Sequence, residues 1–201
     1  MPPETEDFSP PRPIEPPVAP VWARVLASVL DWMLWIPPAA ILFYLALRQP
    51  DLAPLCVGLW LVMKPAYEIL MHGAFGATVG KMLLRIRVAR ADGDPMDMNA
   101  AIRRGFVSAC IGLAAAMIAG RILQGAALQP LPALTGATPP EVIRSAIEKM
   151  LTLLLDNPGY RVLDQLAKLW WVLEWATCLT NPRRRALHDY IGGTVVVKTR
   201  A

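Results

Sequence analysis

Six ionisable residues interrupt stretches of the sequence that are otherwise apolar. They are Arg24, Asp31, Lys64, Glu68, His72 and Glu174. Residues three, four or seven positions apart share one face of a helix, so Arg24 lies on the same face as Asp31. The same spacing puts Lys64, Glu68 and His72 on one face of the second stretch. Carboxylates, an imidazole and basic groups gathered in apolar surroundings could bind a proton or a cation, or could pair with one another.

The charges of this cluster do not cancel. Arg24 and Lys64 are positive, whereas Asp31, Glu68 and Glu174 are negative, which leaves −1 before His72 is counted. A protonated His72, a bound cation or a protonated carboxylate would restore the balance. Two interpretations stay open. The ion pairs could only fix the register of the helices, or the cluster could be a cation or proton site that opens to the cytoplasm.

The cluster sits at a defined depth if the apolar stretches cross a membrane. At about 1.5 Å per residue, Asp31, Lys64, Glu68 and Glu174 all fall in the cytoplasmic half of their helices. In the outer half, between the ends of the spans, we expect Tyr44 and Cys56 but no charged group. A transporter built on this cluster would therefore need oligomerisation or a dry outer gate.

The composition supports the membrane interpretation. Of the 201 residues, 55% are hydrophobic and 18% are charged, and the net charge is +4. Soluble domains are typically about 45–50% apolar and about 25% charged, so the numbers argue against a disordered chain and an ordinary soluble enzyme. The positive charge is too small, and too far from aromatic residues, to indicate nucleic-acid binding.

Four stretches are long enough to cross a bilayer, which takes about 20 apolar residues. The predicted spans are residues 21–47, 52–72, 105–120 and 163–180. Pro37 and Pro38 should kink the first span. Basic residues are concentrated between the second and third spans and after the fourth, so the positive-inside rule places both termini in the cytoplasm. We therefore predict an all-α membrane protein with four transmembrane helices.

The chain outside the spans divides into three parts. Residues 1–20 contain eight prolines and four acidic residues and predict a disordered cytoplasmic tail. Residues 21–198 form the membrane domain, with a non-cytoplasmic insertion at about 121–160. Within that insertion, Thr138 and Glu141 make a capping box, with Pro139 at the first helical position. The helix that follows is amphipathic and should lie at the membrane surface.

Two short segments predict a small cytoplasmic sheet. Residues 85–90 alternate basic and apolar side chains, as a half-buried strand does. Residues 194–198 are rich in valine and form a second strand-like run. We expect the two to pair beneath the membrane.

Small residues recur every four positions in the third span. They are Ser108, Gly112, Ala116 and Gly120. Such a stripe allows another helix to approach closely, within the bundle or between copies. The lipid bilayer is thus one expected partner, and a second copy of the chain or a larger membrane complex is the other.

Several patterns suggest chemistry that the surrounding residues do not support. Residues 76–81 resemble a phosphate loop, but Phe75 and Met82 stand where the pattern needs glycine and a hydroxyl residue. His72 and His188 are the only histidines, too few for a multi-histidine zinc site. The three cysteines lie in apolar runs without a paired spacing. We expect no enzyme activity, cofactor or metal.

Three segments together resemble the RDD family of bacterial membrane proteins. The first holds Arg24 and Asp31; the second runs from Tyr67 through 76–81 to Arg103; the third contains residues 184–189 and 193–197. The resemblance assigns the family's Arg and two Asp residues to Arg24, Asp31 and Asp189. Val79 and Arg85 depart from the family's usual proline and glycine. The resemblance implies a protein of the bacterial cytoplasmic membrane, for which transport is often suggested, and adds Asp189 to the polar cluster.

Overall fold

The computed structural model describes residues 17–92, 94–126 and 139–199. Its helices and strands are α1 (Val21–Arg48), the 3-10 helix η1 (Pro50–Leu52), α2 (Ala53–Phe75), α3 (Val79–Leu83), β1 (Ile86–Arg90), α4 (Met98–Gly125), α5 (Pro140–Asp156), α6 (Pro158–Thr180), α7 (Leu187–Gly192) and β2 (Thr194–Lys198).

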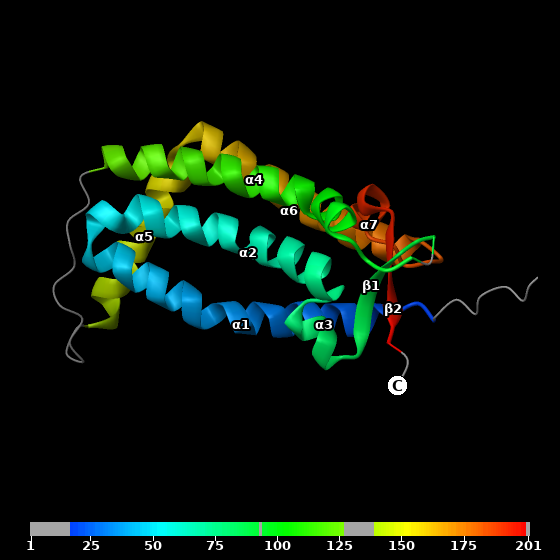
Figure 1. Ribbon diagram of the computed structural model, residues 1–201. Coiled ribbons are helices and arrows are strands. Elements are labelled where there is room, and N and C mark those ends of the chain that lie inside the picture. Colours follow the sequence, from blue (N-terminus) through cyan, green and yellow to red (C-terminus); the bar gives the residue numbers. More distant parts are fainter. Residues whose placement is uncertain (1–16, 93, 127–138, 200–201) are drawn as a thin grey trace, which may run out of the picture.

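Four long helices run lengthwise beside one another, and each reverses the direction of the one before it. These helices are α1, α2, α4 and α6 (Figure 1). The two strands, α3 and α7 lie at one end of this bundle, which we call the sheet end. Helix α5 crosses the opposite end (Figure 1). The bundle thus brings residues far apart in the sequence to the same level.

Within the described residues, three helical stretches are long and apolar enough to cross a membrane. They are Val21–Arg48, Pro50–Phe75 and Met98–Gly125. This agrees with three of the four predicted spans. Helix α6 is 23 residues long and belongs to the bundle, but it carries Arg161, Asp164, Lys168 and Glu174 and is not among the three. A fourth transmembrane span therefore stays a prediction.

Helix α1 continues through its two prolines. Pro37 and Pro38 lie inside the helix, and its axis bends along its length in Figure 1. Proline removes a backbone donor and crowds the preceding turn, which bends a helix without ending it when the remaining bonds are kept.

Helix α4 packs against α2 through its small residues. A Cβ atom added to Gly112 would lie 2.6 Å from the Leu61 carbonyl oxygen, so only glycine permits this approach. Ala116 lies near Gly58 of α2, and a Cβ on Gly58 would meet the Ala116 Cβ at 4.0 Å. A Cβ on Gly120 would meet no described atom within 4 Å. The stripe is therefore used inside the bundle in its middle part and not at Gly120.

The predicted amphipathic helix is α5, and its apolar face packs across the end of the bundle. Met150 and Leu154 are buried in one cluster with Ala46 and Ala53. The helix ends at Asp156, as expected. Thr138 of the predicted capping box lies outside the described residues, and the N-cap position of α5 is Pro139.

The predicted sheet is present. Strands β1 and β2 pair in antiparallel fashion, with Val88 opposite Val196. Both of these valines are buried, whereas Arg87 of the same strand is exposed. This arrangement confirms the alternation that predicted the strand.

Residues 17–19 run alongside β2 on its other edge. The Ala19 backbone N donates to the Val196 carbonyl over 2.9 Å, and the Lys198 N donates to the Pro17 carbonyl over 2.9 Å. The prediction of a disordered tail up to residue 20 is therefore wrong for this segment. Proline keeps its carbonyl acceptor, so a proline-rich segment can still join the edge of a sheet. Residues 1–16 lie outside the described residues.

Candidate functional site

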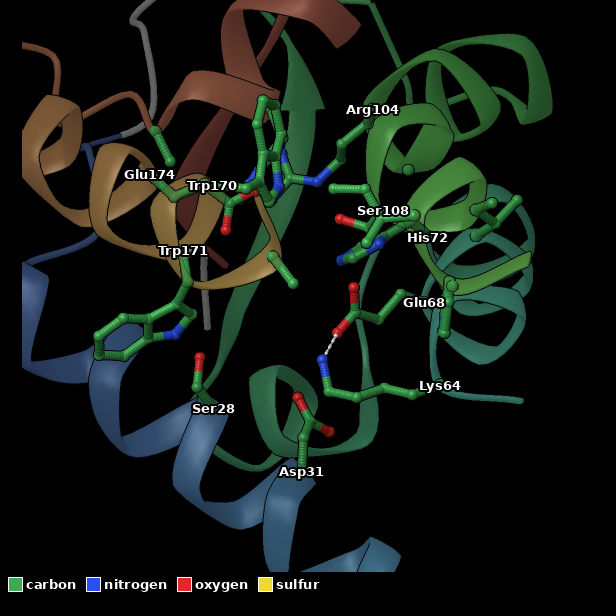
Figure 2. Close-up of a pocket in the computed structure, with 18 of the residues that line it drawn as sticks. Ser28, Asp31, Lys64, Glu68, His72, Arg104, Ser108, Trp170, Trp171 and Glu174 are labelled. Carbon is green, nitrogen blue, oxygen red and sulfur yellow. Dashed lines mark hydrogen bonds and ion pairs between the residues drawn. The ribbon is translucent and has the colours of Figure 1, made fainter. Parts of the chain in front are cut away.

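A cavity of about 470 Å³ lies between α1, α2, α4 and α6, with α3 and α7 closing its sheet end (Figure 2). Ionisable side chains line it from every one of these elements. They are Arg24, Asp31, Lys64, Glu68, His72, Lys81, Arg104, Asp164, Glu174 and His188. The six residues singled out from the apolar stretches all line this cavity. The resemblance-derived Asp189 does not line it, because it is completely buried beneath its sheet end.

Asp189 joins four separate elements. Its carboxylate accepts from Arg24 Nη1 of α1 over 3.1 Å, from Thr194 Oγ1 of β2 over 3.0 Å and from the Ala186 backbone N over 2.9 Å. Arg104 of α4 donates to Oδ1, the oxygen that also accepts from Thr194, whereas Arg24 and Ala186 donate to Oδ2. Burial alone would raise the pKa of Asp189, but the charges of Arg104 and Arg24 hold it well below its usual range. Asp189 is therefore an anion at physiological pH.

Asp31 has no arginine partner and instead holds α3. Its carboxylate accepts from Thr78 Oγ1 over 2.6 Å, from Tyr67 OH over 3.1 Å and from the Gly80 backbone N over 2.9 Å. A Cβ on Gly80 would lie 2.2 Å from the Ala27 carbonyl oxygen, so glycine is required here. The segment that resembled a phosphate loop thus packs against α1 and wraps the Asp31 carboxylate.

Lys81 of α3 lies against His72 of α2. Its ammonium donates to His72 Nε2 over 3.1 Å and to Thr78 Oγ1 over 3.4 Å. Burial, helped by the charge of Arg104, lowers the pKa of Lys81 to about 8, although Glu68, Asp31 and Asp189 oppose this shift. Lys81 therefore loses its proton more readily than an ordinary lysine does.

The remaining charges pair across or along the cavity. Lys64 donates to Glu68 over 2.6 Å within α2, as Figure 2 shows. Glu174 of α6 lies 2.5 Å from His188 Nδ1, and Arg104 Nη2 lies 2.6 Å from His188 Nε2. Because a guanidinium can only donate, His188 Nε2 is an acceptor and Nδ1 carries the proton that Glu174 accepts. Arg104, His188 and Glu174 thus form one hydrogen-bonded chain.

Sequence reasoning missed Lys81, Arg104 and His188. All three lie just outside the apolar stretches, at the ends of the predicted spans, where basic residues are common. Adding them, Asp164 and Asp189 enlarges the set of charged groups. The cationic groups are Arg24, Lys64, Lys81 and Arg104, and the carboxylates are Asp31, Glu68, Asp164, Glu174 and the buried Asp189. The charge of −1 predicted from the sequence left out two of these cations and two of these carboxylates. The omissions cancel, so the sum over all nine groups is again −1 before the histidines are counted.

The cavity also extends farther from the sheet end than expected. It reaches Tyr160 and Asp164 near the start of α6 as well as Cys178 near its end, a separation of about 27 Å between residues 160 and 178 along a helix. Asp164 accepts from Lys168 over 2.6 Å. Asp164, at the outer end of the predicted fourth span, therefore adds a charged group to the far part of the same cavity.

The residues that the structure describes contain no group of three His, Cys, Asp or Glu side chains placed to hold a metal ion. Cys56 and Cys178 are buried and all three cysteines are free.

The fold and the cavity define a helical membrane protein with apolar outer faces and a charged interior. A family model for the RDD family matches residues 18–193, most of the chain. The protein belongs to the RDD family, and Arg24, Asp31 and Asp189 are the residues that carried the resemblance. No curated protein and no solved structure matches the chain.

Proposed function

We propose that the protein is a transporter of the bacterial cytoplasmic membrane whose cavity exchanges a proton with a charged solute. The observation that carries this proposal concerns Lys81, whose ammonium lines the cavity at its sheet end. Its pKa is about 8, and it donates a hydrogen bond to His72. A group with this pKa is mostly protonated at neutral pH, yet a neighbouring charge shifts it easily. Binding an anion would favour the protonated form, whereas binding a cation would favour the neutral form.

The proposal includes four membrane spans and a cytoplasmic sheet end. Helix α6, at 23 residues, is about 35 Å long and suffices for a bilayer core of about 30 Å. Asp164 and Glu174 line the cavity, where an ionisable residue of a membrane helix is tolerated. Exposed Arg85, Arg87 and Arg103 belong to the sheet end, which supports placing this end and both termini in the cytoplasm.

The proton step needs a short path between cavity groups. Lys81 can transfer its proton to Nε2 of a neutral His72, which leaves a neutral amine on Lys81 and an imidazolium on His72, and the reverse transfer restores the pair. This pair can therefore carry one proton in either direction without leaving the cavity. The proposal contains no catalytic step, cofactor or metal.

Proton movement in proteoliposomes tests the proposal. Full-length protein is reconstituted into vesicles of phosphatidylethanolamine and phosphatidylglycerol that contain a pH-sensitive dye. Sodium, chloride and phosphate are present on both sides as the charged solutes for exchange, and a pH gradient is imposed. We expect the pH gradient to collapse faster with the unchanged protein than in empty vesicles. With Lys81→Gln, the collapse should be at least tenfold slower than with the unchanged protein. Lys149→Gln, a change of an exposed lysine on α5, should leave the rate unchanged. A rate equal to that of empty vesicles would contradict the proposal.

The alternative is an accessory subunit of a larger membrane complex. The small-residue stripe and the amphipathic helix suggested it, but Gly112 and Ala116 face α2 and the apolar face of α5 covers the bundle. These two surfaces are thus used within one chain. Co-purification with other membrane proteins in mild detergent, lost when residues 138–157 are deleted, would favour this alternative.

A further inference from the structure

The cavity opens on the side of the bundle, between α1 and α6. Ser28 and Trp32 of α1 and Trp171 of α6 line the cavity and are exposed; Trp32 is 59% and Trp171 61% exposed. Residues that do both must lie at the mouth. In Figure 2, Trp171 lies between α6 and α1 at the edge of the cavity.

This mouth lies at the depth of the bilayer if α1 crosses it. Trp32 is the twelfth residue of α1, about 16 Å from its start. Below that mouth the lining changes from aromatic to charged, since Arg24 and Glu174 line the deeper part near the sheet end. A molecule entering here meets aromatic rings first and charged groups second.

Two donor groups of the cavity lining have no acceptor among the described residues. Arg24 is 7% exposed, and although its Nη1 donates to Asp189, its Nε and Nη2 are buried without a partner. Trp170 Nε1 is likewise buried without a partner. Buried N–H groups are normally hydrogen-bonded. The cavity is therefore short of acceptor oxygens.

The charges next to Arg24 also indicate that an anion is missing there. One carboxylate, Asp189, serves two guanidinium groups, those of Arg24 and Arg104. Glu174 is engaged with His188 rather than with Arg24. An anion at Arg24 would supply both the missing acceptor and a second negative charge, and the guanidinium fork suits a carboxylate or a phosphate.

We propose that the cavity binds an amphiphile with a single anionic head group that enters from the bilayer between α1 and α6. The carboxylate or phosphate of its head accepts from Nε and Nη2 of Arg24, and its hydrocarbon chain passes Trp32 and Trp171 into the lipid. The cavity volume of about 470 Å³ lies in the usual range for ligand sites, roughly 300–1,000 Å³. This inference rests on the proposed function at two points: the mouth lies within the bilayer, and the amphiphile is the transported solute.

Binding, not flux, tests this site. Full-length protein in maltoside micelles is titrated with dodecyl phosphate, with dodecyltrimethylammonium and with inorganic phosphate, and the change in heat is measured by calorimetry. We expect dodecyl phosphate to bind at least tenfold more tightly than either of the others. Arg24→Lys keeps a positive charge for Asp189 but loses the forked donors, and should weaken dodecyl phosphate at least tenfold. Arg103→Lys, the same change at an exposed position of α4, should not.

A second variant tests the mouth without touching the buried ion pair. Trp32→Leu combined with Trp171→Leu should weaken dodecyl phosphate about fivefold or more, whereas Trp22→Leu, at a 65% exposed position of α1 outside the cavity lining, should not. Circular dichroism and thermal melting verify that each variant is folded. Equal affinity for inorganic phosphate and dodecyl phosphate would overturn lateral entry and leave a free-anion site. The inference would be overturned if folded protein bound neither dodecyl phosphate nor inorganic phosphate. Tighter binding of dodecyltrimethylammonium than of dodecyl phosphate would also overturn it. Both results stand apart from the proton-movement assay, which tests the proposed function.

Discussion

Arg24 and Asp189 are 165 positions apart in the chain and form an ion pair of 3.1 Å in which the carboxylate is completely buried. Because Arg104 donates to the same carboxylate, Asp189 ties the start of α1 and the start of α4 to α7. The family's arginine and its last aspartate are thus direct partners, and the closure of the sheet end depends on their contact.

Removing the charge of Asp189 should destabilise the protein strongly. Asp189→Asn leaves two buried guanidinium groups without their anion, and breaking a buried pair in this way costs about 3–5 kcal/mol. Chemical unfolding in detergent, followed by circular dichroism, measures the free energy of unfolding. The control is Asp164→Asn, whose partner Lys168 is 64% exposed and whose loss should cost about 1 kcal/mol or less. Equal losses for the two variants would contradict the central role of Asp189.

The same pair predicts the acid stability of the protein. The pKa of Asp189 is lower in the folded protein than the value of about 3.9 expected after unfolding. Its stabilising contribution is therefore fully present above about pH 4 and is lost as the pH falls towards the folded value. The difference in stability between the unchanged protein and Asp189→Asn should be the same at pH 7 and pH 5, and should shrink below about pH 4.

Lys81 predicts a second rise of stability with pH, at alkaline pH. Its pKa falls from 10.5 to about 8 on folding, so the unfolded chain holds more protons than the folded one between these two values. Stability due to this residue should then rise as the pH increases from about 8 to about 10.5. The measurement is the free energy of unfolding against pH for the unchanged protein, for Lys81→Met and for the exposed Lys149→Met. The rise should disappear only with Lys81→Met.

Two glycines of the α4 stripe should respond oppositely to alanine. Gly112→Ala puts a methyl group 2.6 Å from the Leu61 carbonyl oxygen, and we expect a loss of about 1–3 kcal/mol from the forced separation of α2 and α4. Gly120→Ala meets no described atom within 4 Å and should gain up to about 1 kcal/mol from helix propensity. Thermal melting of both variants distinguishes them. A loss at position 120 would indicate that a partner chain packs there.

Asp31 should tolerate an amide better than an apolar residue. Asp31→Asn keeps the oxygen that accepts from Tyr67 and Gly80, and its amide can donate to Thr78, whose hydroxyl can turn to accept. Asp31→Leu leaves these donors unpaired, at about 1–3 kcal/mol for each buried group. We therefore expect Asp31→Leu to unfold at a clearly lower temperature than Asp31→Asn. The reverse order would contradict the role of Asp31 in holding α3.

The sequence predicted the elements well because their signals are local. Apolar length indicated α1, α2 and α4, alternation indicated β1, and the spacing of Met150 and Leu154 indicated the buried face of α5. Charges inside apolar stretches likewise indicated six residues of the cavity lining. Each of these signals lies within one element.

The hydrogen-bond and ion-pair partners of those charged residues could not be predicted from local sequence patterns. Asp31 shares a helix face with Arg24 but accepts from Thr78 of α3, and Arg24 pairs with Asp189 at the other end of the chain. Lys81, Arg104 and His188 fall outside the apolar stretches, where a charge needs no explanation. Their position on the cavity follows from the packing of α3, α4 and α7, which no local pattern encodes.

The edge pairing of residues 17–19 with β2 has a practical consequence for labelling experiments. Pro17 and Lys198 are hydrogen-bonded to each other through their backbones, so the two described ends of the chain leave the bundle from the same small sheet. A reporter domain fused before residue 17 and another fused after residue 198 should then lie close together. Energy transfer between the two would read out the integrity of the sheet end in intact cells.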